Sequence, residues 1–300
     1  MATAATRAAT PTARSVPPRG RGSIWLLLPV LVVLGAYGAA LLNLLAWSLY
    51  SAGRIGMPRE GEVGIQTYIR IFADPLFRGA LYATFSLSAV ATLSSLALGL
   101  PIAHWIVRTE SRRIRAMLIM LVAIPFMTSL IVRLYALMLV LSNTGLINRT
   151  LGWLGVIADN DFIPLIRNEL SVAIGLTYFV LPFVIFTLAG SFRRFDRTLE
   201  EAAKNMGADE ISTFCHVTLP LLGPGILGAG TLAFVLAGTA FATPLILGGS
   251  AVRMIANVIY DQAMFAQNMP VAAGLSVVAL AFTLVCLYTA GRVARWRRIA

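Results

Sequence analysis

The sequence predicts an all-α, polytopic membrane protein with six transmembrane helices. Of its 300 residues, 58% are hydrophobic and only 12% are charged, and the mean hydropathy is +0.81. This composition is too apolar for an ordinary soluble domain. A helix needs about 20 apolar residues to cross roughly 30 Å of hydrocarbon. Stretches of that kind occur at 24–50, 80–107, 116–141, 170–190, 221–247 and 271–291.

The first stretch also resembles a signal peptide, because Arg19 and Arg21 precede an apolar run that is followed by small residues. The apolar run continues to Tyr50, however, which favours an uncleaved span. Residues 1–22 are rich in Ala, Thr, Pro and Arg, and we expect them to form a disordered cytoplasmic tail. Residues 23–298 are expected to form the transmembrane domain.

The basic residues indicate the orientation of the chain. Four Lys or Arg residues precede the first span, and four more lie in each of the segments 108–115, 193–204 and 292–298. By the positive-inside rule, both termini, the 108–115 turn and the loop 191–220 should be cytoplasmic. Because the basic residues flank spans, the net charge of +11 needs no nucleic-acid partner.

The residues required for ATP, metal or acid–base chemistry are missing from the sequence. Lys204 is the only lysine and follows Ala203, so the chain has no phosphate-binding P-loop. His104 and His216 are the only histidines, and neither has Cys, Asp or Glu at ligand spacing. We therefore expect no catalytic residue, no metal and no cofactor on this chain.

Two alternative classes of membrane protein share the same hydrophobicity. A secondary carrier usually places ionisable groups inside its spans, whereas these spans show no central Asp, Glu or Lys. A membrane enzyme needs a catalytic constellation, and pairs such as His104 with Glu110 lack a third partner. Both alternatives fit the sequence less well than a pore-forming transport subunit.

The loop 191–220 is predicted to contain two short helices. Leu199, Ala202, Ala203 and Met206 recur at helical spacing, and Thr198 with Glu201 forms a possible capping box. Gly207 offers a left-handed stop, a second helix is expected over 208–217, and Pro220 separates this unit from the fifth span. A small helix with an alanine face is suited to a groove on another protein. The alternative is a helical hairpin without a partner.

Within this loop, a glutamate and two alanines are followed, after three intervening residues, by a glycine. After nine further intervening residues come a branched aliphatic residue, one more residue and Leu-Pro. These residues are Glu201, Ala202, Ala203, Gly207, Val217, Thr218, Leu219 and Pro220. The pattern resembles the EAA signature of bacterial ABC importer permeases, with valine in place of the usual isoleucine. The resemblance covers most of the chain after the first span.

The resemblance implies a complex in the bacterial inner membrane. The loop would form coupling helices that dock in a cleft of an ATP-binding cassette ATPase dimer, with the alanines permitting close approach. Glu201 would hold the loop by polar contacts. ATP and Mg would bind to the ATPase and not to this chain. A sibling permease would complete the pore, a periplasmic or lipid-anchored protein would deliver the solute, and lipid would surround the spans.

Other segments are similar to the spermidine and putrescine permease group of this family. They comprise 131–136, Gly145, Ile147, Asn148, Leu151, 181–183, 241–245 and 247–249. That group commonly has Trp before Pro in the last outer loop, whereas this chain has Met269 before Pro270. The cargo is therefore expected to be a polyamine, with an opine, a phosphonate or another small organic solute as the alternative and inorganic anions after these.

Five residues are candidates for the pathway or its gate. Arg133 is a charge within a hydrophobic stretch, near Tyr135, although snorkelling or a structural partner also explains it. Thr243 and Pro244 mark a possible break in the fifth span where freed backbone groups face a cavity, or a simple kink. Asp261 lies near the expected outer mouth, where an acidic group suits a cationic solute.

Overall fold

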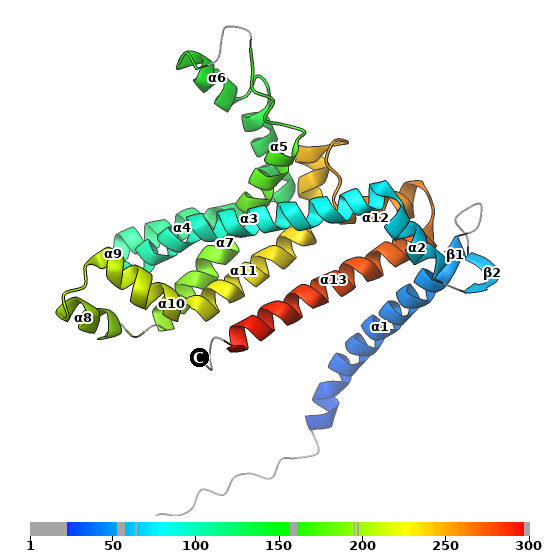
Figure 1. Ribbon diagram of the computed structural model, residues 1–300, viewed down its shortest axis with the longest axis horizontal. Helices are drawn as coiled ribbons and strands as arrows, with labels where there is room; N and C mark the ends of the chain where they lie inside the picture. The colour runs from blue at the N-terminus through cyan, green and yellow to red at the C-terminus, as the bar shows by residue number, and fades with distance from the viewer. Residues whose placement is uncertain are drawn as a thin grey trace, which may run out of the picture. The chain divides into compact units, whose positions relative to one another are not determined.

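The computed structural model describes residues 23–52, 58–63, 65–156, 161–194, 196 and 198–296 (Figure 1). The tail predicted over 1–22 lies outside these residues. The chain divides into two compact units, 1–44 and 45–300. The helices are α1 (Ser23–Leu49), α2 (Gln66–Ala73), α3 (Pro75–Arg108), α4 (Arg112–Met127), α5 (Leu130–Leu141), α6 (Leu146–Trp153), α7 (Glu169–Arg194), α8 (Thr198–Asn205), α9 (Glu210–Thr213), α10 (Leu219–Leu221), α11 (Gly223–Gly238), α12 (Ile255–Tyr260) and α13 (Met269–Trp296), with π-helical turns η1 (Phe214–Thr218), η2 (Pro244–Gly248) and η3 (Asp261–Phe265).

A small antiparallel sheet follows the first helix. Strand β1 (Tyr50–Ala52) pairs with β2 (Pro58–Val63), and Tyr50 lies opposite Val63. The hydroxyl of Thr67 in α2 donates to the Tyr50 carbonyl at 2.9 Å. This hairpin lies in the polar connection after the first span and was not predicted from the sequence.

The predicted membrane spans are largely confirmed. Among the described residues, five helices are long and apolar enough to cross a membrane, or six if one bent pair counts as a span. The first, second, fourth and sixth predicted spans correspond to α1, α3, α7 and α13. The bent pair joins 210–221 to α11 at 66°, and α11 lies within the fifth predicted span.

The third predicted span, 116–141, is not one continuous helix. Helix α4 ends at Met127 and α5 begins at Leu130, with Thr128 between them in an extended conformation. The Thr128 hydroxyl donates to the Pro125 carbonyl at 3.0 Å. Such local hydrogen bonds, next to a proline, compete with helix continuation. The apolar span in this region instead runs from Leu130 to Trp153.

The core of the larger unit lies where α3, α7 and α11 pack together. Helix α7 contributes side chains that are almost completely buried, including Leu176, Val180 and Leu188, and α11 contributes Ala229 and Ala233. Small residues allow this close approach: a Cβ at Gly99 would lie 2.9 Å from Val184 Cγ1. Tight packing through small residues is typical of membrane helices, since lipid provides no hydrophobic force between them.

A second apolar cluster joins α2, α3, α12 and α13 at one end of the bundle. It contains Ile71, Phe77, Ala80, Ile255, Val258, Val271 and Leu275. The hydroxyl of Thr84 in α3 accepts a hydrogen bond from the Ile255 backbone N–H at 2.8 Å. This contact satisfies the first turn of α12, whose N–H groups have no partner inside the helix.

Candidate functional site

The loop 191–220 joins α7 to α11, and Figure 1 shows its short helices grouped near one end of α3. The first of them, α8, ends where the sequence predicted. Gly207 has φ +92°, and the Ala208 N–H donates to the Ala203 carbonyl at 3.1 Å. A left-handed glycine with this hydrogen bond is a common helix C-terminus. The predicted left-handed stop at Gly207 is confirmed.

The start of α8 differs from the prediction. Thr198 is already the first helical residue, and its N–H donates to Asp196 Oδ1 at 3.0 Å. The predicted capping box of Thr198 with Glu201 is therefore wrong, because Asp196 supplies the capping carboxylate. Hydrogen bonds from the backbone N–H and then the hydroxyl of Thr198 lower the pKa of Asp196, since they favour its charged form.

The second helix of the loop is shorter than predicted and changes its geometry. Asp209 caps α9 by accepting a hydrogen bond from the Ser212 N–H at 3.1 Å. From Phe214 to Thr218 the chain forms a π-helical turn and then continues into α10. The break before α11 comes at Leu222, two residues after Pro220.

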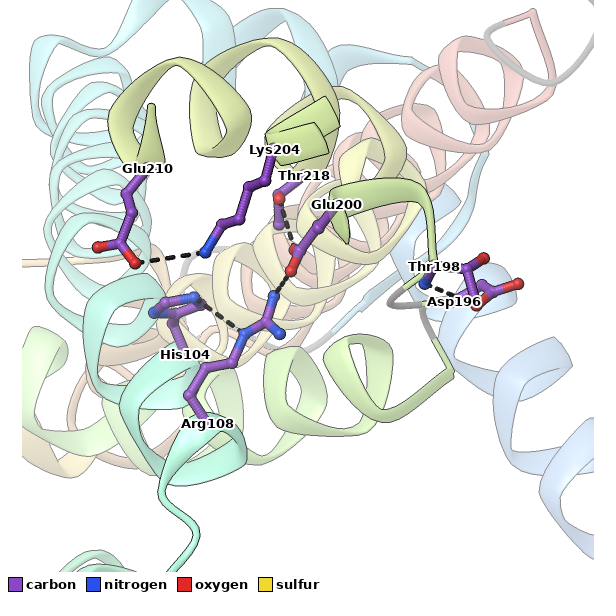
Figure 2. Close-up of polar contacts among 8 residues, drawn as sticks. All are labelled: His104, Arg108, Asp196, Thr198, Glu200, Lys204, Glu210 and Thr218. Carbon is purple, nitrogen blue, oxygen red and sulfur yellow. Dashed lines mark hydrogen bonds and ion pairs between the residues drawn. The ribbon is translucent and has the colours of Figure 1, made fainter. Parts of the chain in front are cut away.

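A buried carboxylate ties the loop to α3. Glu200 is 7% exposed, forms an ion pair with the Arg108 guanidinium, and accepts a hydrogen bond from the Thr218 hydroxyl at 2.6 Å. Figure 2 shows Arg108 and Thr218 approaching the Glu200 carboxylate from different sides. These polar contacts are made by Glu200, the residue before Glu201, whereas Glu201 is exposed. The polar contacts expected of Glu201 stay a prediction.

The remaining residues of the motif divide between the interior and the surface. Ala203 is 6% exposed, whereas Ala202, at the preceding position of the helix, is exposed. Leu219 is half-buried and Pro220 is exposed. Apolar side chains flank Ala202 on the surface, with Met206 exposed to 83%. Leu199 and Ile211 are also exposed.

A cavity of about 690 Å³ lies between the end of α3 and this loop. Its wall includes His104, Arg108, Glu200, Thr213 and Phe214. The His104 ring lies 5.5 Å from the Phe214 ring, measured between centroids, and its Nε2 accepts from Arg108 Nε at 3.3 Å. His104 thus lies on α3 and faces the loop.

The polar pair at the cavity rim belongs to the loop itself. Lys204 of α8 and Glu210 of α9 form an ion pair with a separation of 3.3 Å between Nζ and Oε1. The Glu210 side chain is 89% exposed. This pair joins two loop helices to each other, in contrast to Glu200, which joins the loop to a long helix.

The predicted pathway residues do not meet in one site of this chain. Arg133 and Tyr135 lie on α5, where Tyr135 is 54% exposed and Arg133 Nε is buried without a hydrogen-bond partner. Asp261 begins η3 and forms an ion pair with Arg253 at 3.4 Å. Within the described residues, no hydrogen bond or ion pair joins these groups to one another.

Thr243 and Pro244 lie at a real break in the fifth span and are buried. Helix α11 ends at Gly238, and η2 begins at Pro244. The amide of Asn257 donates to the Phe241 carbonyl at 3.1 Å, which satisfies a group freed by the break. Thr243 is 1% exposed, so its side chain packs inside the subunit and does not line an open surface.

Three residues of this site, Glu200, Arg108 and Asp196, were not predicted from the sequence. Asp196 precedes a helix and could have been recognised as a capping residue. Arg108 lies in the basic turn and Glu200 is next to the motif, but their pairing joins positions 92 apart in the sequence. In the part of the chain that the structure describes, no cluster of three His, Cys, Asp or Glu residues has metal-binding geometry.

Comparison with known proteins identifies relatives over most of the chain. A family model described as "Binding-protein-dependent transport system inner membrane component" matches residues 95–297. The spermidine/putrescine transport system permease protein PotB of Salmonella typhimurium is 33% identical over 231 residues, which cover 76% of this chain and 79% of that protein. The inner membrane ABC transporter permease protein YdcU of Escherichia coli is 29% identical over 281 residues, covering 90% and 88%.

Solved structures share the fold at lower identity. A chain of the bacterial alginate ABC transporter, crystallised with an alginate pentasaccharide-bound periplasmic protein, has a TM-score of 0.74 and 17% identity over 91% of this chain and 95% of its own. A chain of the MetNI methionine ABC transporter in inward facing conformations has a TM-score of 0.57 and 19% identity, covering 74% and 95%. With its apolar spans and this matched family model, the chain is a multi-pass inner-membrane protein that belongs to the family of binding-protein-dependent transport system inner membrane components.

Proposed function

We propose that this permease subunit of an ABC importer forms half of the pore for a polyamine such as spermidine or putrescine. The observation that carries the cargo is the 33% identity to a spermidine/putrescine permease over 76% of the chain. An opine, a phosphonate or another small organic solute is the alternative cargo within the same class. A secondary carrier is the distant alternative.

The proposed coupling surface is the exposed side of the loop helices. It consists of Leu199, Ala202, Met206 and Ile211, all of which are exposed. An apolar face on a short helix is suited to a groove of a partner. ATP-driven closure of the ATPase dimer would move this surface and switch the attached spans between inward-facing and outward-facing packings. ATP and Mg belong to the ATPase in this proposal, and this chain binds no cofactor.

The remaining partners follow from the same proposal. A sibling permease supplies the other half of the pore, and a periplasmic or lipid-anchored solute-binding protein delivers the cargo. Both termini lie in the cytoplasm, lipid surrounds the spans, and no nucleic acid is involved. The loop 191–220 then lies on the cytoplasmic side of the membrane, together with the basic segments, as the positive-inside rule requires. The ATPase binds on this side.

The charges of the chain support a limited role in cargo selection. The Asp261 carboxylate already pairs with Arg253 at 3.4 Å, and Thr243 and Pro244 are buried in the subunit. A binding site for a polycation would need aromatic groups, or acidic groups that are not already paired with basic side chains. We therefore assign cargo selection mainly to the binding protein, with Arg133 and Tyr135 on α5 as candidate pathway residues.

Co-purification of the tagged chain from membranes tests this function. We expect a stoichiometric ATPase and a sibling permease to co-purify, and ATP hydrolysis to rise when the binding protein is loaded with spermidine or putrescine. Stimulation by an opine or phosphonate alone would replace the polyamine assignment with the alternative cargo. A chain that purifies alone and transports solute with an ion gradient would instead be a secondary carrier.

A further inference from the structure

The Glu200 carboxylate contacts three segments that are far apart in the sequence. It lies in the first turn of α8, pairs with Arg108 at the end of α3, and accepts from Thr218 in η1 at 2.6 Å (Figure 2). Its side chain is 9% exposed, and that of Arg108 is 29% exposed. A charge this well buried is stable only when its partners are in place.

We propose that Glu200 is the positioning residue that makes α3 move with the coupling loop. This inference rests on the proposed function, because it assigns a mechanical role within ATPase-driven transport. The backbone connects the loop to α7 and α11 only. The contact with Arg108 adds α3, which packs along α7 and α11 through the buried core.

The length of α8 explains why such a tie is needed. The helix has 8 residues, and isolated helices shorter than about 12–15 residues are marginal in water. Apart from Ala203 and Glu200, its side chains in the described structure are exposed. A displacement of α8 by the ATPase would deform only the loop unless the buried side of α8 contacts the helix bundle. Glu200 and Ala203 provide that contact.

Through Thr218, the contact between Glu200 and Arg108 also depends on the geometry of the end of the loop. The Thr218 hydroxyl is in the π-helical turn that leads into α10 and α11. Glu200 therefore links the entry side of the loop, its exit side and α3 through one carboxylate. The pair of Lys204 with Glu210 has no such reach, because both residues lie within the loop.

The first test compares two glutamate-to-glutamine substitutions on the same loop. The complete complex of both permeases, ATPase and binding protein is reconstituted in liposomes with Glu200→Gln or, as the matched control, Glu210→Gln. We expect Glu200→Gln to retain the ATPase and its hydrolysis but to lower solute transported per ATP by at least about fivefold. Glu210→Gln should keep the original ratio of solute transported to ATP hydrolysed, because its carboxylate pairs with Lys204 of the same loop and, in the described structure, forms no ion pair with α3.

A cross-linking rescue separates a mechanical tie from a folding role. The native cysteines are first removed by Cys215→Ser and Cys286→Ser. In this background, the double variant Glu200→Cys and Arg108→Cys should transport as little solute per ATP as Glu200→Gln. Bridging the two thiols with a short bifunctional thiosulfonate should restore the original ratio, since the reagent replaces the lost connection. A merely structural role would leave the ratio unchanged by bridging.

The results that overturn the inference are distinct from failure of the proposed function. A normal ratio in Glu200→Gln, loss of the ATPase from that variant, or no recovery on bridging would each show that Glu200 does not transmit the loop's motion. A wild-type complex that binds no ATPase would contradict the proposed function itself, and this inference with it.

Discussion

At the scale of single residues, neighbouring positions of the loop have opposite environments. Glu200 and Ala203 are buried, whereas Glu201 and Ala202 are exposed. A helix of 3.6 residues per turn brings positions three apart onto the same side. The motif therefore contains both an anchoring side and a free side, and a substitution acts differently on each.

Gly207 is constrained by its backbone and not by space. Its φ is +92°, and a Cβ there would meet nothing within 4 Å. We expect Gly207→Val to destabilise this turn by about 1–2 kcal/mol or more, because a left-handed conformation is costly for branched residues. Gly207→Asn should cost less, since Asn tolerates that region. Uptake assays of the two variants check this order.

Gly190→Ala is the matched control, because a Cβ there also meets nothing within 4 Å and the residue lies within α7. It should leave uptake unchanged. Equal loss of uptake from Gly207→Val and Gly207→Asn would contradict the backbone explanation.

Asp196 makes the start of α8 dependent on pH. Its pKa is lowered from 3.8 by hydrogen bonds from Thr198, so its contribution to helix stability is present above about pH 3.8 and is lost as the pH falls through the lower, folded pKa. The protection factors of the α8 amides, which correct for the intrinsic slowing of hydrogen exchange in acid, should therefore fall as the pH drops. Asp196→Asn should remove this part of the pH dependence, and an unchanged pH profile in that variant would contradict the assignment.

At the scale of elements, the helices that were predicted best are those whose apolar runs have no competing local signal. Helices α7 and α13 match their predicted spans because their length and composition leave few alternatives. The third and fifth predicted spans are interrupted, at Thr128 and after Gly238. A hydropathy pattern averages over such breaks, since one or two extended residues hardly change it.

The contact of α7 with η2 depends on the absence of a side chain at Gly175. A Cβ there would clash with the Leu247 side chain of η2 and would lie 2.7 Å from Cγ2 of Thr243, the residue before η2. We expect Gly175→Ala to lower the free energy of unfolding by about 1–3 kcal/mol through overpacking. Thermal denaturation of the purified protein in detergent measures this change. Gly190→Ala, with no neighbour within 4 Å, should keep or raise the midpoint, since alanine is favoured over glycine inside a helix.

At the scale of the whole molecule, the sequence predicted the class of protein and the short helices of the loop 191–220 but not how this loop is anchored. The positions of Glu201, Ala202 and Gly207 mark the loop from their spacing alone. The pairing of Glu200 with Arg108 depends on how α3 packs beside the loop. Such tertiary pairing leaves no periodicity in a single sequence, and so only the structure reveals it.

Docking of the ATPase should depend on the exposed apolar side of α8. Met206 is 83% exposed, so Met206→Glu places a charge on the surface without disturbing the core. We expect the variant to insert normally while recovery of the ATPase with the tagged chain falls by about tenfold, as for loss of about 1.4 kcal/mol of binding. Undiminished recovery of the ATPase would exclude this side of α8 as the docking surface.

The bend before α11 determines the direction in which the span can be driven. Residues 210–221 and α11 meet at 66°, so a force applied along the first axis acts mostly sideways on the second. Helix α11 would then change its tilt relative to the membrane normal and would not move along that normal. Sliding would pull apolar residues into water at one interface and polar residues into lipid at the other, at a high cost in solvation. A tilting stroke avoids that cost, and the depth of the span in the bilayer should therefore stay nearly constant through the transport cycle.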